Sequence, residues 1–246
     1  MERSIIKQLK EWKNSPLRKP LILAGARQVG KTYILKEFGK REYKHVAYIN
    51  CDNNPDVTGL FAEDYDMKRI LLVIGALTGQ PIIPGETLII LDEIQELPKG
   101  LAALKYFCEN APEYHVAVAG SLLGVALHRG ESAPVGKADI IRLFPMSFEE
   151  YLMARGEEQI ARILLSKDWT TISMLHDKLT KLLREYYFVG GMPEAVAEYL
   201  DVGDITRLAP IFNAVLKGYN EDAEKFAKNY FKNFKNYTIK EFYYFI

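Results

Sequence analysis

The sequence has few cysteines, no long apolar run and no net charge. Cys51 and Cys108 are its only cysteines in 246 residues and form no CxxC pair, so neither a disulfide framework nor a zinc site is expected. Apolar runs such as 70–77 are too short to span a bilayer, and the charged start MERSIIKQLKEW is not a signal peptide. Lysine plus arginine equals aspartate plus glutamate at 32 each, so no overall field favours nucleic acid or a membrane. We therefore expect a cytoplasmic protein without a membrane partner.

The charge is unevenly distributed along the chain. Residues 1–45 hold 12 lysines and arginines against 4 acids, and residues 46–100 hold 3 against 9. Ordinary surface charge explains this pattern. A basic face that meets a polyanion, either nucleotide or nucleic acid, also explains it.

Short apolar segments alternate with amphipathic ones, and 48% of the residues are hydrophobic, enough for a sizeable core. Strands are expected at 21–24, 46–49, 88–91, 116–119 and 140–143. Helices are expected at 4–13, 31–38, 64–77 and 101–109, and after Pro145 at 148–155, 157–165, 172–188 and 193–200. Wholly apolar strands between helices predict an α/β fold with a parallel sheet covered on both faces. We expect an α/β core over residues 1–145 and a helical lid with an atypical tail over 146–246.

The stretch GARQVGKT at residues 25–32 fits G-x-x-x-x-G-K-[ST] between an expected strand and helix. The glycines let several backbone N–H groups point at one anion, and the helix start adds positive charge. Lys31 is expected to reach the β- and γ-phosphates, and the Thr32 hydroxyl to ligate Mg²⁺. The residues expected to bind the nucleotide are Gly25, Ala26, Arg27, Gln28, Val29, Gly30, Lys31, Thr32 and Tyr33.

Two acids, Asp92 and Glu93, follow the apolar run at 88–91. Ligands of an open parallel sheet bind at the carboxyl ends of its strands, so Asp92 is expected in the Mg²⁺ shell. Glu93 is expected to polarise the attacking water, although both acids also suit a helix cap. The strand at 46–49 and the Asp-Glu order favour a hydrolytic P-loop fold over a nucleotide kinase.

The strand at 116–119 ends at Gly120 and Ser121. Ser121 either hydrogen-bonds the γ-phosphate or the attacking water, or caps the next helix. The four histidines show no metal spacing and are expected to be structural; they are His45, His115, His128 and His176.

The segments GARQVGKT, LDEIQ, AGSLLG, LFPMSFEEYL and YYFVGGMPEAV occur in this order. Together they resemble a bacterial and archaeal family of AAA+-type ATPases that usually carry a C-terminal domain of unknown function. The resemblance covers about residues 1–200 and implies a P-loop ATPase core, a helical lid, ATP and Mg²⁺. It implies phosphate-loop roles for Lys31 and Thr32, Walker B roles for Asp92 and Glu93, and a sensor 1 role for Ser121.

The resemblance also implies an arginine finger, which such proteins often carry as Gly-Arg before the last core strand. Lys137 stands there and lacks the bidentate fork of arginine, so Arg129 and Arg142 are rival candidates. Arg184 is the nearest candidate for sensor 2. An exposed, solvated side chain is the simpler explanation of each of these bases.

The last 21 residues contain five phenylalanines, four tyrosines, four lysines and three asparagines. Three explanations fit this tail: a helix packed on the lid, a degenerate end, or aromatic contacts with nucleic acid bases.

The sequence thus predicts a Mg²⁺-dependent AAA+-type ATPase that hydrolyses ATP to ADP and phosphate and moves its lid or a partner. Glu93, Lys31 and Ser121 are the expected catalytic residues, and self-association is compatible with a trans-acting finger. An ATP-binding switch with little hydrolysis and a DNA-associated module are the alternatives. ATP is preferred over GTP because of the resemblance and because no NKxD motif is evident.

Overall fold

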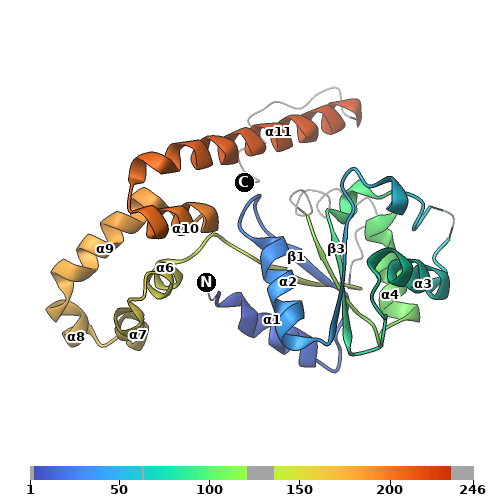
Figure 1. Ribbon diagram of the computed structural model, residues 1–246, viewed down its shortest axis with the longest axis horizontal. Helices are drawn as coiled ribbons and strands as arrows, with labels where there is room; N and C mark the ends of the chain where they lie inside the picture. Colours follow the sequence, from blue (N-terminus) through green and yellow to red (C-terminus); the bar gives the residue numbers. More distant parts are fainter. Residues whose placement is uncertain (1–2, 63, 121–135, 234–246) are drawn as a thin grey trace.

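A five-stranded parallel sheet lies at the centre of the amino-terminal part of the molecule (Figure 1). The computed structural model describes residues 3–62, 64–120 and 136–233. The strands are β1 (Leu21–Ala24), β2 (His45–Asn50), β3 (Thr87–Asp92), β4 (His115–Ala119) and β5 (Asp139–Arg142). Their order is β2-β3-β4-β1-β5, and every neighbouring pair is parallel. The predicted parallel α/β sheet is therefore confirmed.

Helices flank the sheet and then form a separate lobe (Figure 1). Around the sheet lie α1 (Ile5–Asn14), α2 (Lys31–Glu42), α3 (Met67–Thr78) and α4 (Gly100–Asn110), with short 3₁₀ turns at Pro55–Val57 and Ile94–Glu96. The lobe contains α6 (Phe148–Ala154), α7 (Glu158–Ser166), α8 (Trp169–Met174), α9 (His176–Val189), α10 (Pro193–Val202), η3 (Ile205–Leu208) and α11 (Ala209–Asn233). None of the helices in the described ranges is long and apolar enough to cross a membrane.

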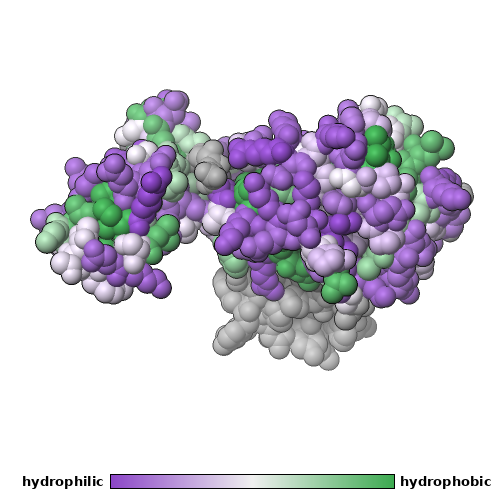
Figure 2. All heavy atoms as spheres, turned by 90° about the horizontal axis from the view of Figure 1, so that it is seen from below, coloured by the Kyte–Doolittle hydropathy of each residue, from purple (hydrophilic) through white to green (hydrophobic). Residues whose placement is uncertain are grey.

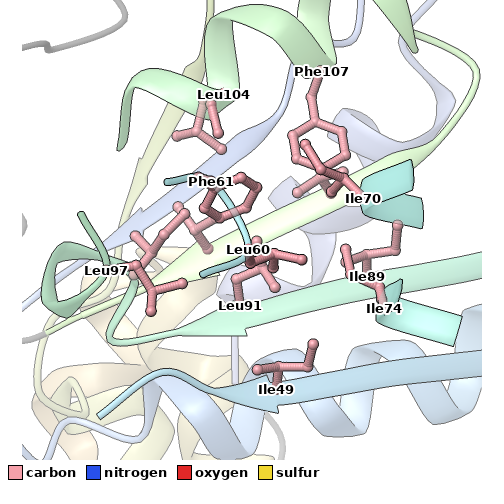
Figure 3. Packing of buried hydrophobic residues seen from close by; sticks show 14 of the residues in the cluster. Ile49, Leu60, Phe61, Ile70, Ile74, Ile89, Leu91, Leu97, Leu104 and Phe107 are labelled. Atoms are coloured by element: carbon pink, nitrogen blue, oxygen red, sulfur yellow. The ribbon is translucent and has the colours of Figure 1, made fainter. Parts of the chain in front are cut away.

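Alternate strand residues point to opposite faces of the sheet, as the pleat requires. On one face Ile89 and Leu91 of β3 pack with Ile70 of α3 and Phe107 of α4 (Figure 3). On the other face the neighbouring β3 residues, Leu88 and Ile90, join α1 and α2 through the buried side chains of Leu9, Leu35 and Phe38. Because both faces are covered, the strands are apolar throughout, which is the pattern that the sequence shows.

The strand register brings several loop starts to one edge of the sheet. Asp92 at the end of β3 lies opposite Asn50 of β2 and Ala119 of β4, and Ala119 also pairs with Leu23 of β1. Strand β4 thus separates the strand before the glycine loop from the strand before the two acids. The carboxyl ends of β1, β4 and β3 consequently face one shared space.

The helical lobe has its own apolar clusters, one centred on Tyr151 and Val189 and one on Leu152 and Leu182. Figure 2 shows this lobe set apart from the core. The side of the molecule seen there is mainly hydrophilic. The connection after β5 is fixed by backbone contact, since Met146 N donates to Gly191 O over 2.6 Å. A side chain at position 191 would place its Cβ 2.4 Å from Met146 O, so this approach needs glycine.

Three sequence predictions of helices need correction. The single helix expected at 172–188 is wrong: α8 and α9 are separate because Asp168 caps an earlier start and Leu175 leaves the helical conformation. The helix expected from residue 64 begins at Met67, since the Asp66 side chain accepts from the N–H groups of Lys68 and Arg69. The prediction ended at residue 200 and missed most of α11, whose apolar pattern is interrupted by Gly218.

His115 lies buried beneath α1, where its ring lies near Trp12 and its Nδ1 is 2.7 Å from the Tyr43 hydroxyl. Burial lowers the pKa of His115 to about 4, with smaller contributions from Arg18 and Lys13. Its ordinary value is about 6.5, so between these values the unfolded chain binds the proton and the folded protein does not.

We therefore expect the free energy of unfolding to fall as pH drops from 6.5 to 4, by up to about 3 kcal/mol from this residue. Urea unfolding at pH 7, 5.5 and 4.5 measures this loss. The variant His115→Gln should show a shallower pH dependence than the wild type. Parallel curves for the two proteins would show that His115 does not couple to folding.

Candidate functional site

The glycine loop joins β1 to α2 and is packed tightly against the last core strand. A Cβ on Gly25 would lie 2.3 Å from the carbonyl oxygen of Leu143, so only glycine fits there. Gly30 adopts a left-handed conformation (φ 93°) directly before α2, and Gln28 does the same (φ 64°). These turns hold the loop curled at the positive end of a twelve-residue helix.

Lys31 extends across this loop. Its Nζ donates to the carbonyl oxygens of Gly25 (2.9 Å) and Ala26 (2.8 Å), and the residue is buried. Burial lowers the pKa of Lys31, while the charges of Glu93 and Asp92 oppose that shift. The ammonium group therefore lies inside the loop and close to both acids.

Asp92 accepts two hydrogen bonds on one oxygen. Thr32 Oγ1 donates to Asp92 Oδ2 over 2.6 Å, and the Tyr48 hydroxyl donates to the same oxygen over 3.2 Å. Burial and the Asp92 charge raise the pKa of Tyr48 to about 12, which keeps this hydroxyl a donor. Tyr48 was not predicted as a site residue, because it lies inside strand β2 and belongs to no recognised motif.

Glu93 follows in a left-handed backbone conformation (φ 52°), which is strained for a residue with a side chain. Its N–H donates to Ala119 O over 2.7 Å, and its carboxylate accepts a hydrogen bond from Gln95 Nε2. Gln95 was not predicted, and it holds the carboxylate from only two residues away. The Glu93 charge is near enough to Lys31 to raise the pKa of that ammonium, so both groups belong to the same site.

Thr32 and Asp92 are 60 positions apart in the sequence, but the fold brings their side-chain oxygens together as a candidate magnesium site. Thr32 and Asp92 offer hydroxyl and carboxylate oxygens, the ligand types that Mg²⁺ prefers. Among the described residues there is no group of three or more histidines, cysteines or acids that could hold a metal by itself.

A cavity of about 230 Å³ opens beside the start of α2. It is lined by Arg3, Gly30, Tyr33, Ile34, Met146 and Pro193. The lining comes from the amino-terminal segment, α2, the connection after β5 and the first residue of α10. Its mostly apolar walls and its place next to the glycine loop suit a flat ring joined to phosphates.

Arg3 connects the walls of this cavity. Its guanidinium donates to Val29 O (3.3 Å), to Phe144 O (2.7 Å) and to Glu150 Oε2 (3.0 Å). Glu150 also accepts from Ser4 and closes a capping box with Ser147 at the start of α6. Arg3 and Glu150 were not predicted, although Ser147 and Glu150 have the S-x-x-E spacing of that box.

The candidates for an arginine finger and for sensor 2 lie elsewhere. Lys137 pairs with Glu109 over 2.9 Å, Arg142 is exposed at the end of β5, and Arg184 is exposed on α9. Ser121 and Arg129 lie outside the described residues. The roles of all five stay predictions.

Much of the basic charge near the amino terminus is paired within the molecule. Seven of the 12 lysines and arginines in residues 1–45 form ion pairs with acids. They are Arg3, Lys10, Lys13, Arg27, Lys40, Arg41 and Lys44. Four of these bases share two acids of the same segment, Glu37 and Glu42, so the ion pairs offset only part of the charge surplus.

The glycine loop lies between β1 and α2, and the two acids follow β3, which is separated from β1 in the sheet by β4 alone. This arrangement defines a nucleotide-binding P-loop protein of the AAA+ type. The model of a family described as "AAA domain" matches residues 17–152, more than half of the sequence. The chain belongs to this family of ATP-binding domains. No curated protein matches the sequence.

A solved structure shows the same fold. The Walker-type ATPase PABY2304 of Pyrococcus abyssi aligns over 92% of this chain and 75% of its own, with 18% identity and a TM-score of 0.53. The ORC2 protein of Aeropyrum pernix (18% identity, 61% of this chain and 49% of its own, TM-score 0.40) is also similar. The RuvB branch migration motor of Thermotoga maritima is similar as well, with 17% identity over 67% of this chain and 52% of its own and a TM-score of 0.41. The chain thus spans about half of the last two proteins.

Proposed function

We propose that this protein is a Mg²⁺-dependent ATPase that binds ATP at the carboxyl edge of its sheet and hydrolyses it to ADP and phosphate. One observation carries the proposal: Thr32 of the glycine loop and Asp92 of β3 meet at 2.6 Å, with Lys31 and Glu93 beside them. These four residues are the predicted phosphate, metal and water ligands.

Binding would begin at the phosphate loop. The curled backbone of residues 25–30 and the start of α2 favour an anion. Lys31 would exchange the carbonyl oxygens of Gly25 and Ala26 for the β- and γ-phosphates, gaining a charged partner for a buried ammonium. The base would enter the cavity beside Tyr33, whose walls include Arg3.

Thr32 and Asp92 would hold the magnesium ion, directly or through water. When bound, Mg²⁺ neutralises charge that develops on the phosphates during transfer. The Thr32 and Tyr48 hydroxyls fix the Asp92 carboxylate in place. A preoriented carboxylate loses less entropy when it engages the ion.

Glu93 would orient the attacking water and take its proton. The hydrogen bond from Gln95 Nε2 to the Glu93 carboxylate supports this role, because it would hold the carboxylate in position. Ser121, in the segment after β4, would contact the γ-phosphate or this water.

The helical lobe would act as a lid. We propose that residues 1–145 form the ATPase core and 146–246 the lid and tail. Arg3 touches both, through Val29 of the phosphate loop and Glu150 of α6. A movement of the phosphate loop on loss of the γ-phosphate would thereby be transmitted through Arg3 to helix α6 of the lid.

A nucleotide-dependent switch with little hydrolysis is the second candidate. It is favoured by Lys137, which stands where related proteins often have an arginine finger and is paired with Glu109. A DNA-associated module is the third candidate, and the basic surplus of residues 1–45, which ion pairs offset only in part, is the observation behind it. DNA binding that weakens steeply with added salt would support that alternative.

Phosphate release from Mg·ATP, measured over a range of protein concentrations, tests the proposal. We expect turnover that is lost in EDTA. A specific rate that rises with concentration would indicate a residue supplied in trans by a second copy. Tight binding without turnover at every concentration would favour the switch.

A further inference from the structure

Helix α11 returns from the lid and lies against the phosphate loop. Figure 1 shows it passing above the connection between β1 and α2. The contact is made by Arg27, whose Nη1 donates to Asp222 Oδ1 (3.1 Å) and to Gly218 O (3.3 Å). Glu221 adds a second acid, with 3.7 Å between its carboxylate and Arg27.

The fit between loop and helix is close. A Cβ on Gly218 would lie 2.9 Å from Arg27 Cδ, so the arginine rests where a side chain would otherwise stand. Glycine within a helix is unfavourable by itself. Here it leaves room for Arg27 to donate a hydrogen bond to the carbonyl oxygen of Gly218. The Asp222 side chain is only 14% exposed in this contact.

The carboxylates stand where they oppose a polyanion. Asp222 is near enough to Lys31 to raise the pKa of that ammonium, against the larger effect of burial. Triphosphate on residues 25–32 would therefore face Asp222 and Glu221 as like charges, while Arg27 would be attracted to the phosphates instead. Carboxylate and phosphate compete for the same cation.

We propose that α11 is a built-in latch: Asp222 and Glu221 hold Arg27 and restrain the phosphate loop until nucleotide phosphates displace them. This inference rests on the proposed function of the same site. It assigns α11 the role of setting nucleotide affinity and of coupling phosphate binding to movement of the lid's last helix.

The test measures the Kd of the full chain for Mg·ATP, Mg·ADP and AMP by calorimetry. The double variant Asp222→Asn/Glu221→Gln should bind Mg·ATP about fivefold more tightly. The gain should shrink for Mg·ADP and vanish for AMP, because the repulsion scales with phosphate charge. Asp201→Asn, which neutralises an exposed acid at the end of α10, is the matched control and should leave all three values unchanged.

A second variant breaks the contact without changing charge. Gly218→Ala would push Arg27 away, and alanine favours the helix, so a folding defect is not expected. It should tighten Mg·ATP binding in the same direction by a smaller factor. Hydrogen exchange adds a direct readout, since amides of residues 216–224 should exchange faster when wild-type protein binds Mg·ATP.

The outcomes separate the two proposals. Wild type and variants that bind Mg·ATP equally well would overturn the latch and leave the nucleotide-binding proposal intact. Weaker binding in the acid-neutralised variant, or slower exchange in α11 with nucleotide, would also overturn the latch. If no protein in the series binds nucleotide, both proposals fall.

Discussion

Replacing Glu93 by glutamine is expected to lower phosphate release from Mg·ATP by at least about 100-fold, because an amide cannot take the proton of the attacking water. Nucleotide binding should stay within about threefold of wild type, since glutamine preserves the size of the side chain and adds no charge. Phosphate release under saturating Mg·ATP, with Kd measured in parallel, checks both parts.

Glu96→Gln is the matched control for this variant. Glu96 lies three residues further along, in the turn Ile94–Glu96, and is exposed. It should keep wild-type turnover. Equal turnover in Glu93→Gln and wild type would exclude Glu93 as the base, and the second acid of the LDE segment would then be structural.

Replacing Lys31 by alanine is expected to weaken Mg·ATP binding by at least about 30-fold, because a buried cation that faces the phosphates is removed. The variant should remain folded, since Lys31 Nζ donates to carbonyl oxygens of its own loop and to no distant element in the described part of the chain. Calorimetry measures the affinity, and circular dichroism monitors the fold.

Lys40→Ala serves as its control on the same helix. Lys40 lies in the last turn of α2, 71% exposed at its side chain, with Glu37 as its ion-pair partner. Its loss should change Kd by less than about twofold, since surface pairs contribute little. Comparable losses of affinity in both variants would point to general charge attraction instead of a phosphate contact.

The sequence located the candidate site where its residues are close neighbours in the chain. Residues 25–32 and the pair Asp92–Glu93 each combine an apolar strand with polar residues directly after it. The motifs predicted that Thr32 and Asp92 lie at one edge of the sheet, but the strand order that brings their side chains to 2.6 Å came only from the structure.

Contacts between distant segments were not predictable in this way. Arg3 and Glu150 are separated by 147 positions, and Arg27 and Asp222 by 195. No periodicity links such pairs; they depend on how the lid turns back on the core. The break at Leu175 was missed for a different reason, because both flanking segments keep an apolar helical spacing.

The two tryptophans of the chain lie in different environments, so their intrinsic fluorescence can report on two parts of the molecule. The chain has only two tryptophans: Trp12 is buried beside His115, and Trp169 is 70% exposed on α8. Their emission maxima should differ, since one indole is in an apolar environment and the other in water. Loosening of the core and rearrangement of the lid can therefore be followed separately, in one unlabelled sample, as nucleotide is added.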